Sequence, residues 1–165
     1  MKPKRIFKHL MTGQLALRRV FPPRALRAIE QAIRGCEAAH RGQIRFAVEP
    51  ALDFIPLLRG QTARQRAHQV FSQLRVWDTE HNNGVLIYLL LADRDVEIVA
   101  DRGVHARLGN VGWEEICRRM EKSFRAGQFE QGVIAGVEAV AGHLEQHYPA
   151  QPTQSNELPD TPVIL

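Results

Sequence analysis

The chain has 165 residues, of which 44% are hydrophobic and 24% charged, and its formal net charge is +4 at pH 7. A chain of this length and composition predicts one globular domain with tails. Its longest apolar run, residues 85–92, has the length of a strand, which excludes a membrane-spanning helix from the prediction. The two cysteines lack the spacing of a metal site, so we expect core roles for them and a cytoplasmic location.

Positive charge is concentrated at the N-terminus. Residues 1–34 carry nine Lys and Arg against one acid, whereas the remainder carries 13 against 17. Residues 1–21 are therefore predicted to form a basic arm that docks partly on its own domain or contacts an anionic membrane surface through residues 1–20. The second alternative would place the protein at the inner face of the membrane. No uninterrupted apolar segment follows the basic residues, as a secretory signal requires, and no nucleic-acid-binding signature accompanies the charge.

The first half of the domain is predicted to form a helix, a strand, a loop and a second helix. A proline pair opens a predicted helix over residues 22–42. Residues 43–49 alternate as a strand, and residues 50–61 form an apolar loop that we expect to cover the core. A Thr-x-x-Gln capping box begins a second helix over residues 62–75.

The centre of the chain predicts a β-hairpin between two polar loops. Residues 85–92 are apolar on both faces, as expected of a strand that is covered on both sides. Residues 93–94 supply the turn, and residues 95–101 alternate as the second strand. If the two strands pair from the residues directly beside the turn, Gly84 lies opposite Gly103. The two polar loops then meet at one end of the sheet.

These two loops contain the candidate site. The candidate ligand-binding residues are Asp78, His81, Asn82, Asn83, Gly84, Asp101, Arg102 and Gly103. Carboxylate and amide oxygens suit Ca²⁺ or Mg²⁺, with Asp78 and Asp101 as the candidate metal ligands, whereas imidazole and guanidinium groups suit an anion. In the alternative interpretation, Asn-Asn-Gly is a plain turn and the acids only solvate the loop end.

The Asp-Arg-Asp sequence at residues 93–95 is interpreted as part of the hairpin turn. An apolar strand that leads into Asp-x-Asp also begins the haloacid-dehalogenase phosphatases. Here Glu97 stands where that motif has Thr or Val, and a second strand follows at once. Other catalytic signatures are absent from the sequence, so no catalytic residue is assigned.

Two helices and a tail complete the chain. Apolar residues at helical spacing predict helices over residues 113–127 and 129–148. Residues 150–165 contain three prolines and are predicted to be disordered. The resulting order α-β-α-β-β-α-α indicates an α/β fold, bordering on α+β. We expect a small mixed sheet of three to four strands with helices on both faces.

The hairpin and the two helices after it resemble the TPM domain family over residues 22–149. The matching residues are Asn83-Gly84, Val85 to Leu91, Asp93-Arg94, Ile98, Gly103, Phe124, Gly127, Phe129 and Gly132. The resemblance implies a mixed-sheet fold and, for some members, Ca²⁺ binding and acid-phosphatase activity. The family's usual Leu-Thr-Asp after the second strand is replaced here by Leu108-Gly109-Asn110, so an acid that could serve the site is missing.

The resulting functional hypothesis is a non-enzymatic TPM-domain binding or accessory module with a protein partner. It would be soluble or peripheral to the membrane and would recognise its ligand or partner at the loop end of the hairpin. The alternative is a weak acid phosphatase assisted by a divalent metal, with Asp78, Asp101 and Arg102 around the phosphomonoester.

Overall fold

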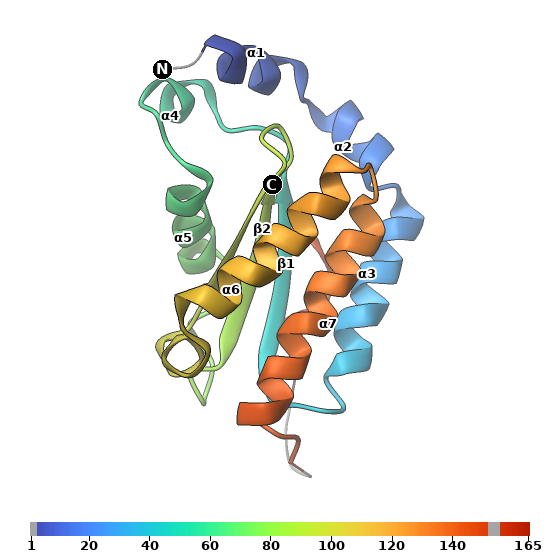
Figure 1. Cartoon of the computed structure of the whole chain (residues 1–165), viewed down its shortest axis with the longest axis vertical. Helices are drawn as coiled ribbons and strands as arrows, with labels where there is room; N and C mark the ends of the chain where they lie inside the picture. Colours follow the sequence, from blue (N-terminus) through green and yellow to red (C-terminus); the bar gives the residue numbers. More distant parts are fainter. Residues whose placement is uncertain (1–2, 152–155) are drawn as a thin grey trace.

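The chain folds around a four-stranded mixed sheet that carries helices on both faces (Figure 1). The computed structural model describes residues 3–151 and 156–165. The strands are β1 (Gln43–Glu49), β2 (Gly84–Leu90), β3 (Asp95–Ala100) and β4 (Val163–Ile164), in the order β3-β2-β1-β4. The helices are α1 (Pro3–Met11), α2 (Gln14–Val20), α3 (Pro23–Cys36), α4 (Phe54–Leu58), α5 (Ala63–Gln73), α6 (Arg102–Arg125) and α7 (Phe129–His147). The predicted α/β class and the helices on both faces are confirmed.

Each face of the sheet has its own hydrophobic core. Alternate side chains of β1, β2 and β3 point to one face, where they pack against α2, α3, α6 and α7. The side chains between them point to the other face and pack against α4 and α5. Every residue of β1 and β2 is buried, which explains why β2 is almost entirely apolar. β1 also carries Gln43, Arg45 and Glu49, which are buried and hydrogen-bonded on the face of α4 and α5.

The strand pairing follows the predicted topology with a different register. β1 and β2 run parallel, joined through α5, and β2 and β3 form the antiparallel hairpin. Gly84 lies opposite Asp101, whose N–H donates to the Gly84 carbonyl at 2.9 Å, so the predicted pairing of Gly84 with Gly103 is wrong by two residues. The tight turn spans residues 91–94, because the Arg94 N–H donates to the Leu91 carbonyl. A shift of two residues leaves every side chain on its predicted face.

The N-terminal arm is helical, and it packs against the domain. Leu17 and Phe21 are fully buried between α3 and the sheet. At α1, the Arg5 Nε atom lies 2.9 Å from Asp93 Oδ2, and His9 Nε2 lies 3.2 Å from Asp93 Oδ1. The Leu52 N–H donates to His9 Nδ1 at 3.0 Å. Of the two arrangements expected for the arm, the structure therefore contains the docked one.

The prediction of a disordered tail is wrong for residues 156–165. β4 pairs in parallel with β1, and the Leu165 N–H donates to the Val48 carbonyl at 3.0 Å. Side chains of the domain anchor the segment before β4: Arg45 donates to the Pro159 carbonyl, and Arg34 Nε lies 3.2 Å from Asp160 Oδ2. These contacts compensate for the low hydrophobicity of the tail. Residues 152–155 lie outside the described residues.

Two helical segments occupy stretches predicted as loops. α6 begins at Arg102 rather than at Trp113, because the Asp101 carboxylate caps the helix by accepting the Arg102 N–H at 2.6 Å. A kink at Gly109, with φ of 71°, separates this first part from the predicted helix. α4 lies within the apolar loop. No helix of residues 3–151 and 156–165 is both long enough and apolar enough to cross a membrane.

Candidate functional site

The two polar loops meet at one end of the sheet, as predicted, and glycines allow their close contact. A Cβ atom at Gly103 would lie 3.0 Å from the Asn82 carbonyl oxygen and 2.9 Å from the Tyr148 hydroxyl. A Cβ atom at Gly84 would overlap the backbone carbonyl of Val76. We call the meeting point of Asn82–Gly84 and Asp101–Gly103 the loop end.

The loop end contains two buried oxygen atoms without a donor. Asn83 is fully buried, and its Nδ2 group donates to the Arg41 carbonyl at 2.8 Å, but its Oδ1 atom has no partner among the described residues. The second oxygen is Asp101 Oδ2, which is buried and likewise lacks a donor in this part of the chain. Unpaired buried acceptors are costly, so these two atoms suit a ligand donor, a bound water or a cation.

Apart from the two glycines, the other predicted site residues face solvent. Asp78, His81 and Arg102 are exposed. Asn82 is also exposed, and its φ of 50° is the left-handed conformation that asparagine tolerates in a turn. The plain-turn interpretation is therefore correct for the backbone of this segment. It does not account for the buried oxygens of Asn83 and Asp101.

The loop end offers few conventional metal ligands. Among the described residues, no group of three or more His, Cys, Asp and Glu side chains could hold a metal ion. A Ca²⁺ or Mg²⁺ ion held by Asp78 or Asp101 would therefore need amide or backbone oxygens as further ligands, which both ions accept. Asn83 Oδ1 is the amide oxygen available for that role.

Sequence reasoning missed the aromatic and cationic groups beside the loop end. The Tyr148 ring follows α7, and its hydroxyl approaches Gly103. The guanidinium carbons of Arg41 and Arg107 lie 6.0 and 5.4 Å from the centroid of this ring. Tyr148 and Arg41 are distant from the two loops in sequence, so no local pattern could have revealed them. Arg107 is close in sequence, but its approach to the Tyr148 ring depends on the helical start of α6, which was not predicted.

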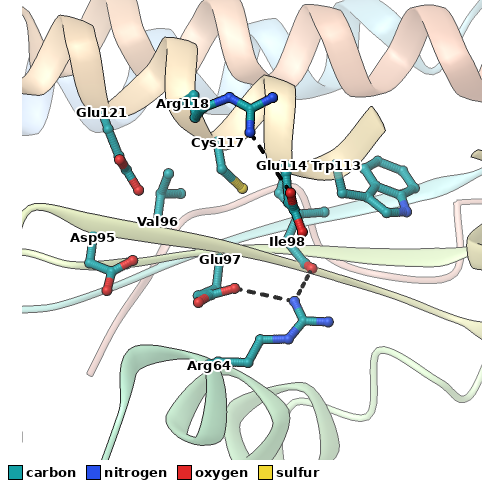
Figure 2. A pocket seen from close by; sticks show the side chains of 10 residues that line it. All are labelled: Arg64, Asp95, Val96, Glu97, Ile98, Trp113, Glu114, Cys117, Arg118 and Glu121. Carbon is teal, nitrogen blue, oxygen red and sulfur yellow. Dashed lines mark hydrogen bonds and ion pairs between the residues drawn. The ribbon is translucent and has the colours of Figure 1, made fainter. Parts of the chain in front are cut away.

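A cavity of about 500 Å³ lies elsewhere, where α6 crosses the outer strand β3 (Figure 2). It is lined by four carboxylates, two arginines, a cysteine and a tryptophan. The charged residues of the lining are Asp95, Glu97, Glu114, Glu121, Arg64 and Arg118. Arg64 Nη1 donates to Glu97 Oε2 at 3.2 Å and to the Ile98 carbonyl at 2.7 Å (Figure 2). One guanidinium thus occupies a backbone carbonyl of β3.

Burial controls the titration of this acidic cavity. Burial raises the pKa of Asp95 to about 6, and the carboxylates of Glu97, Glu121 and Asp93 act in the same direction. Burial also raises the pKa of Glu97, although Arg64 opposes this effect. Burial raises the pKa of the Cys117 thiol to about 12, which keeps the thiol protonated and unreactive. The alternating acids of β3 resemble solvent-facing positions in the sequence, so the cavity was not predicted.

The pattern of the TPM domain family matches residues 17–143, about three quarters of the chain. The protein belongs to the TPM domain family. Among solved structures, it is similar to the BA42 protein of the psychrophilic bacterium Bizionia argentinensis, at 28% identity. That match has a TM-score of 0.76 and covers 86% of this chain and 93% of BA42.

A second similar structure supports the fold alone. The N-terminal domain of a protein from P. gingivalis is 22% identical, with a TM-score of 0.59. The match covers 73% of this chain and 76% of that domain. The comparison with curated proteins gave no match. The resemblance seen in the hairpin and its following helices is thus confirmed, and it extends into α2.

Proposed function

We propose that this TPM-domain protein is a non-enzymatic binding module that docks on an anionic membrane surface through α1 and α2, on the cytoplasmic side. One observation carries the proposal: four large apolar side chains of these helices are exposed to solvent. Their exposed fractions are 66% for Phe7, 66% for Leu10, 69% for Met11 and 81% for Leu15. We call these four residues the apolar face.

The orientation of α1 explains why this face is exposed. Arg5 and His9 contact Asp93, so the opposite side of the helix faces outward. Phe7, Leu10 and Met11 are spaced i, i+3 and i+4 and therefore lie together on that outer side. Ile6 packs partly against the core, but the remaining contacts of α1 with the domain are polar while most of its apolar side chains meet solvent, the reverse of an ordinary surface helix.

Charge makes an anionic membrane the fitting partner. Lys4 and Lys8 flank the apolar face on α1, and Arg18 and Arg19 are exposed on α2. Each basic side chain near an anionic bilayer contributes about 1 kcal/mol of attraction. α4 lies at the same end of the molecule as α1 (Figure 1), and its Phe54 and Ile55 are exposed, so this end carries further apolar surface.

Vesicle flotation of the full chain tests the membrane proposal. We expect binding to phosphatidylglycerol vesicles that weakens at high salt, and little binding to neutral phosphatidylcholine vesicles. The double substitution Phe7→Ser and Leu10→Ser should reduce binding about tenfold or more, since it removes apolar area that the bilayer would bury. Val111→Ser is the matched control, because Val111 on α6 is 75% exposed but lies outside the apolar face.

Point substitutions are preferable to truncation here. Deleting residues 1–20 would also remove Leu17, which is fully buried, and would unfold part of the core. Binding that is equal for the wild type and the double variant, or equal on neutral and anionic vesicles, would refute the proposal.

The loop end is the second proposed binding site, because Asn83 Oδ1 and Asp101 Oδ2 are buried without donors. A donor group of a protein partner or a small ligand would pair with these oxygens, and a Ca²⁺ or Mg²⁺ ion could use them as ligands. Titration with CaCl₂ or MgCl₂, followed by amide chemical shifts, tests the cation. Shifts at Asn83 and Asp101 that are lost in Asp101→Asn support it, and an unchanged spectrum argues against it.

The acid-phosphatase alternative requires the same loop end. Hydrolysis of an aryl phosphate with Ca²⁺, Mg²⁺ or Mn²⁺ should be assayed for the wild type, Asp101→Asn and Asp78→Asn. Asp78 is exposed, so its substitution tests the chemistry without disturbing the α6 cap. Metal-dependent hydrolysis that both substitutions abolish would replace the binding-module proposal, whereas activity that survives them would not originate at this site.

A further inference from the structure

A second cavity lies at the opposite end of the hairpin from the loop end. It has a volume of about 660 Å³ and is bounded by three parts of the chain: α1 and α2, the β2–β3 turn, and the junction between α6 and α7. Figure 1 shows these parts gathered at one end of the molecule. We call this cavity the turn pocket.

The cavity lining combines positive charge with apolar surface. Lys8 of α1, Arg94 of the turn and Arg125 of α6 all contribute to it. Asp93 is the acidic residue of the lining, and its two carboxylate oxygens already face Arg5 and His9. The apolar part consists of Ala16, Val20, Leu91, Ala92 and Phe129.

The cations of the turn pocket are largely free to bind a ligand. Within the described residues, Lys8 and Arg94 have no carboxylate partner. Arg125, whose side chain is exposed, lies 3.7 Å from the half-buried Glu121 in an i, i+4 pair at the long end of ion-pair distances, a contact that contributes little. The pocket therefore carries a net positive charge at neutral pH.

The turn itself holds Arg94 in position. Arg94 has a φ of 53°, which is uncommon for a residue with a side chain, and its guanidinium carbon lies 5.9 Å from the centroid of the Phe129 ring. Phe129 is fixed in turn, because it stacks on Phe124 at 5.3 Å and meets the edge of Phe21 at 6.0 Å. The turn conformation and a fixed aromatic ring thus position the Arg94 guanidinium beside the apolar part of the turn pocket.

We propose that the turn pocket binds the phosphate headgroup and the adjoining acyl chain of an anionic phospholipid. Lys8, Arg94 and Arg125 would bind the phosphate oxygens, since guanidinium and ammonium groups form charge-assisted hydrogen bonds with them. Val20, Leu91 and Phe129 would contact the first methylene groups of the chain. This inference extends the proposed membrane docking to a specific lipid site, and its test does not depend on a bilayer.

Titration with dihexanoyl phosphatidic acid, which stays monomeric in solution, tests the proposal. We expect amide chemical-shift changes at residues 91–94 and 125–129, and a dissociation constant that rises about tenfold or more in Arg94→Glu. Arg27→Glu is the matched control, because it makes the same charge change at an exposed position of α3 outside the pocket. Absence of binding by the wild type, or equal binding by the wild type and Arg94→Glu, would overturn the inference.

Titration with inorganic phosphate tests whether the turn pocket recognises a lipid headgroup or free phosphate. Phosphate should bind the same residues at least about tenfold more weakly than the lipid, because it makes no contact with the apolar side chains of the lining. Equal affinities would assign the pocket to free phosphate and overturn the lipid site.

The outcomes also separate this inference from the proposed docking. If the monomeric lipid binds but vesicles do not, the membrane docking is refuted and the lipid site in the turn pocket is retained. If vesicles bind the wild type and Arg94→Glu equally and the monomeric lipid does not bind, the lipid site in the turn pocket is refuted and the membrane docking is retained.

Discussion

The two ends of the β2–β3 hairpin are built in opposite ways. At the loop end, backbone meets backbone, because Gly84 and Gly103 leave no side chain between neighbouring segments. At the turn end, side chains make the contacts: Asp93 faces both Arg5 and His9 of α1, and His9 also accepts the Leu52 N–H. A contact made through glycine tolerates almost no change, whereas a contact made through charged side chains can open and close. We therefore expect substitutions of the loop-end glycines to destabilise the whole fold, and substitutions at the turn end to release only one helix.

The largest effect is expected for Gly84→Ala. The added Cβ atom would overlap the Val76 carbonyl, and because that atom belongs to the backbone, neither partner can move aside without shifting a strand. The free energy of unfolding should fall by about 3 kcal/mol or more. Urea denaturation measures it, with Gly35→Ala as the control.

Gly35 is a suitable control because a Cβ atom at this position of α3 meets no atom within 4 Å. This substitution should leave stability unchanged or raise it by up to about 1 kcal/mol. Similar destabilisation by Gly84→Ala and Gly35→Ala would contradict the rigid contact at the loop end.

A smaller and more local effect is expected for Asp93→Asn. The loss of the carboxylate charge weakens the contacts to Arg5 and His9, at a cost of about 1–2 kcal/mol. Hydrogen exchange should accelerate in α1 while the amides of β1 and β2 remain protected. Asp53→Asn, at an exposed aspartate before α4, should leave exchange in α1 unchanged. Global destabilisation with no selective change in α1 would show that the turn end is as rigid as the loop end.

Asp95, at the first position of β3, should make stability depend on pH. Its folded-state pKa is raised to about 6 from the ordinary value of 3.8, so the folded protein holds this proton more tightly than the unfolded chain. The resulting stabilisation is complete below about pH 4 and is lost as the pH rises to about 6. Asp95→Asn should therefore exceed the wild type in stability by on the order of 1 kcal/mol at pH 7, and by little at pH 4. Urea denaturation at both pH values checks this, and a difference that does not change with pH would contradict it.

The smallest effects are expected for the exposed residues of the loop end. Asp78→Asn and Arg102→Gln should each change the free energy of unfolding by less than about 0.5 kcal/mol. Thermal denaturation without ligand measures this. A larger loss would show that these side chains belong to the rigid part of the loop end and are not free for recognition.

The sequence was sufficient for those parts of the fold that rest on local patterns. The capping box of α5 is present, with the Gln65 N–H donating to Thr62 Oγ1 at 3.1 Å and the Thr62 N–H donating to Gln65 Oε1 at 3.1 Å. The buried strands and the hairpin also follow from periodicity. The meeting of the two loops could be predicted as well, because antiparallel pairing determines which residues lie at the same end of the sheet.

Features that depend on distant side chains could not be predicted. β4 has only two residues, and it forms because Arg45 and Arg34 bind the segment before it across more than 110 positions of sequence. The orientation of α1 depends on contacts of Arg5 and His9 with Asp93, which lies more than 80 positions away in the sequence. The hairpin register was wrong because Leu91 and Ala92 belong to the turn, in which the Arg94 N–H donates to the Leu91 carbonyl, so the last β2–β3 pair is Leu90 with Asp95. Tyr148 reaches the loop end only through the packing of α7.

The two borders of the sheet have a consequence for self-association. An unpaired strand edge is a template on which another chain can add a strand, and this can lead to aggregation. On one border, Arg64 occupies the outward Ile98 carbonyl of β3, and the acids around it would repel a second copy of the same strand. On the other border, β4 covers Ala47 and Val48 of β1. The short C-terminal strand thus closes this edge of the sheet, and its removal would leave the buried strand β1 open to pairing with a second chain.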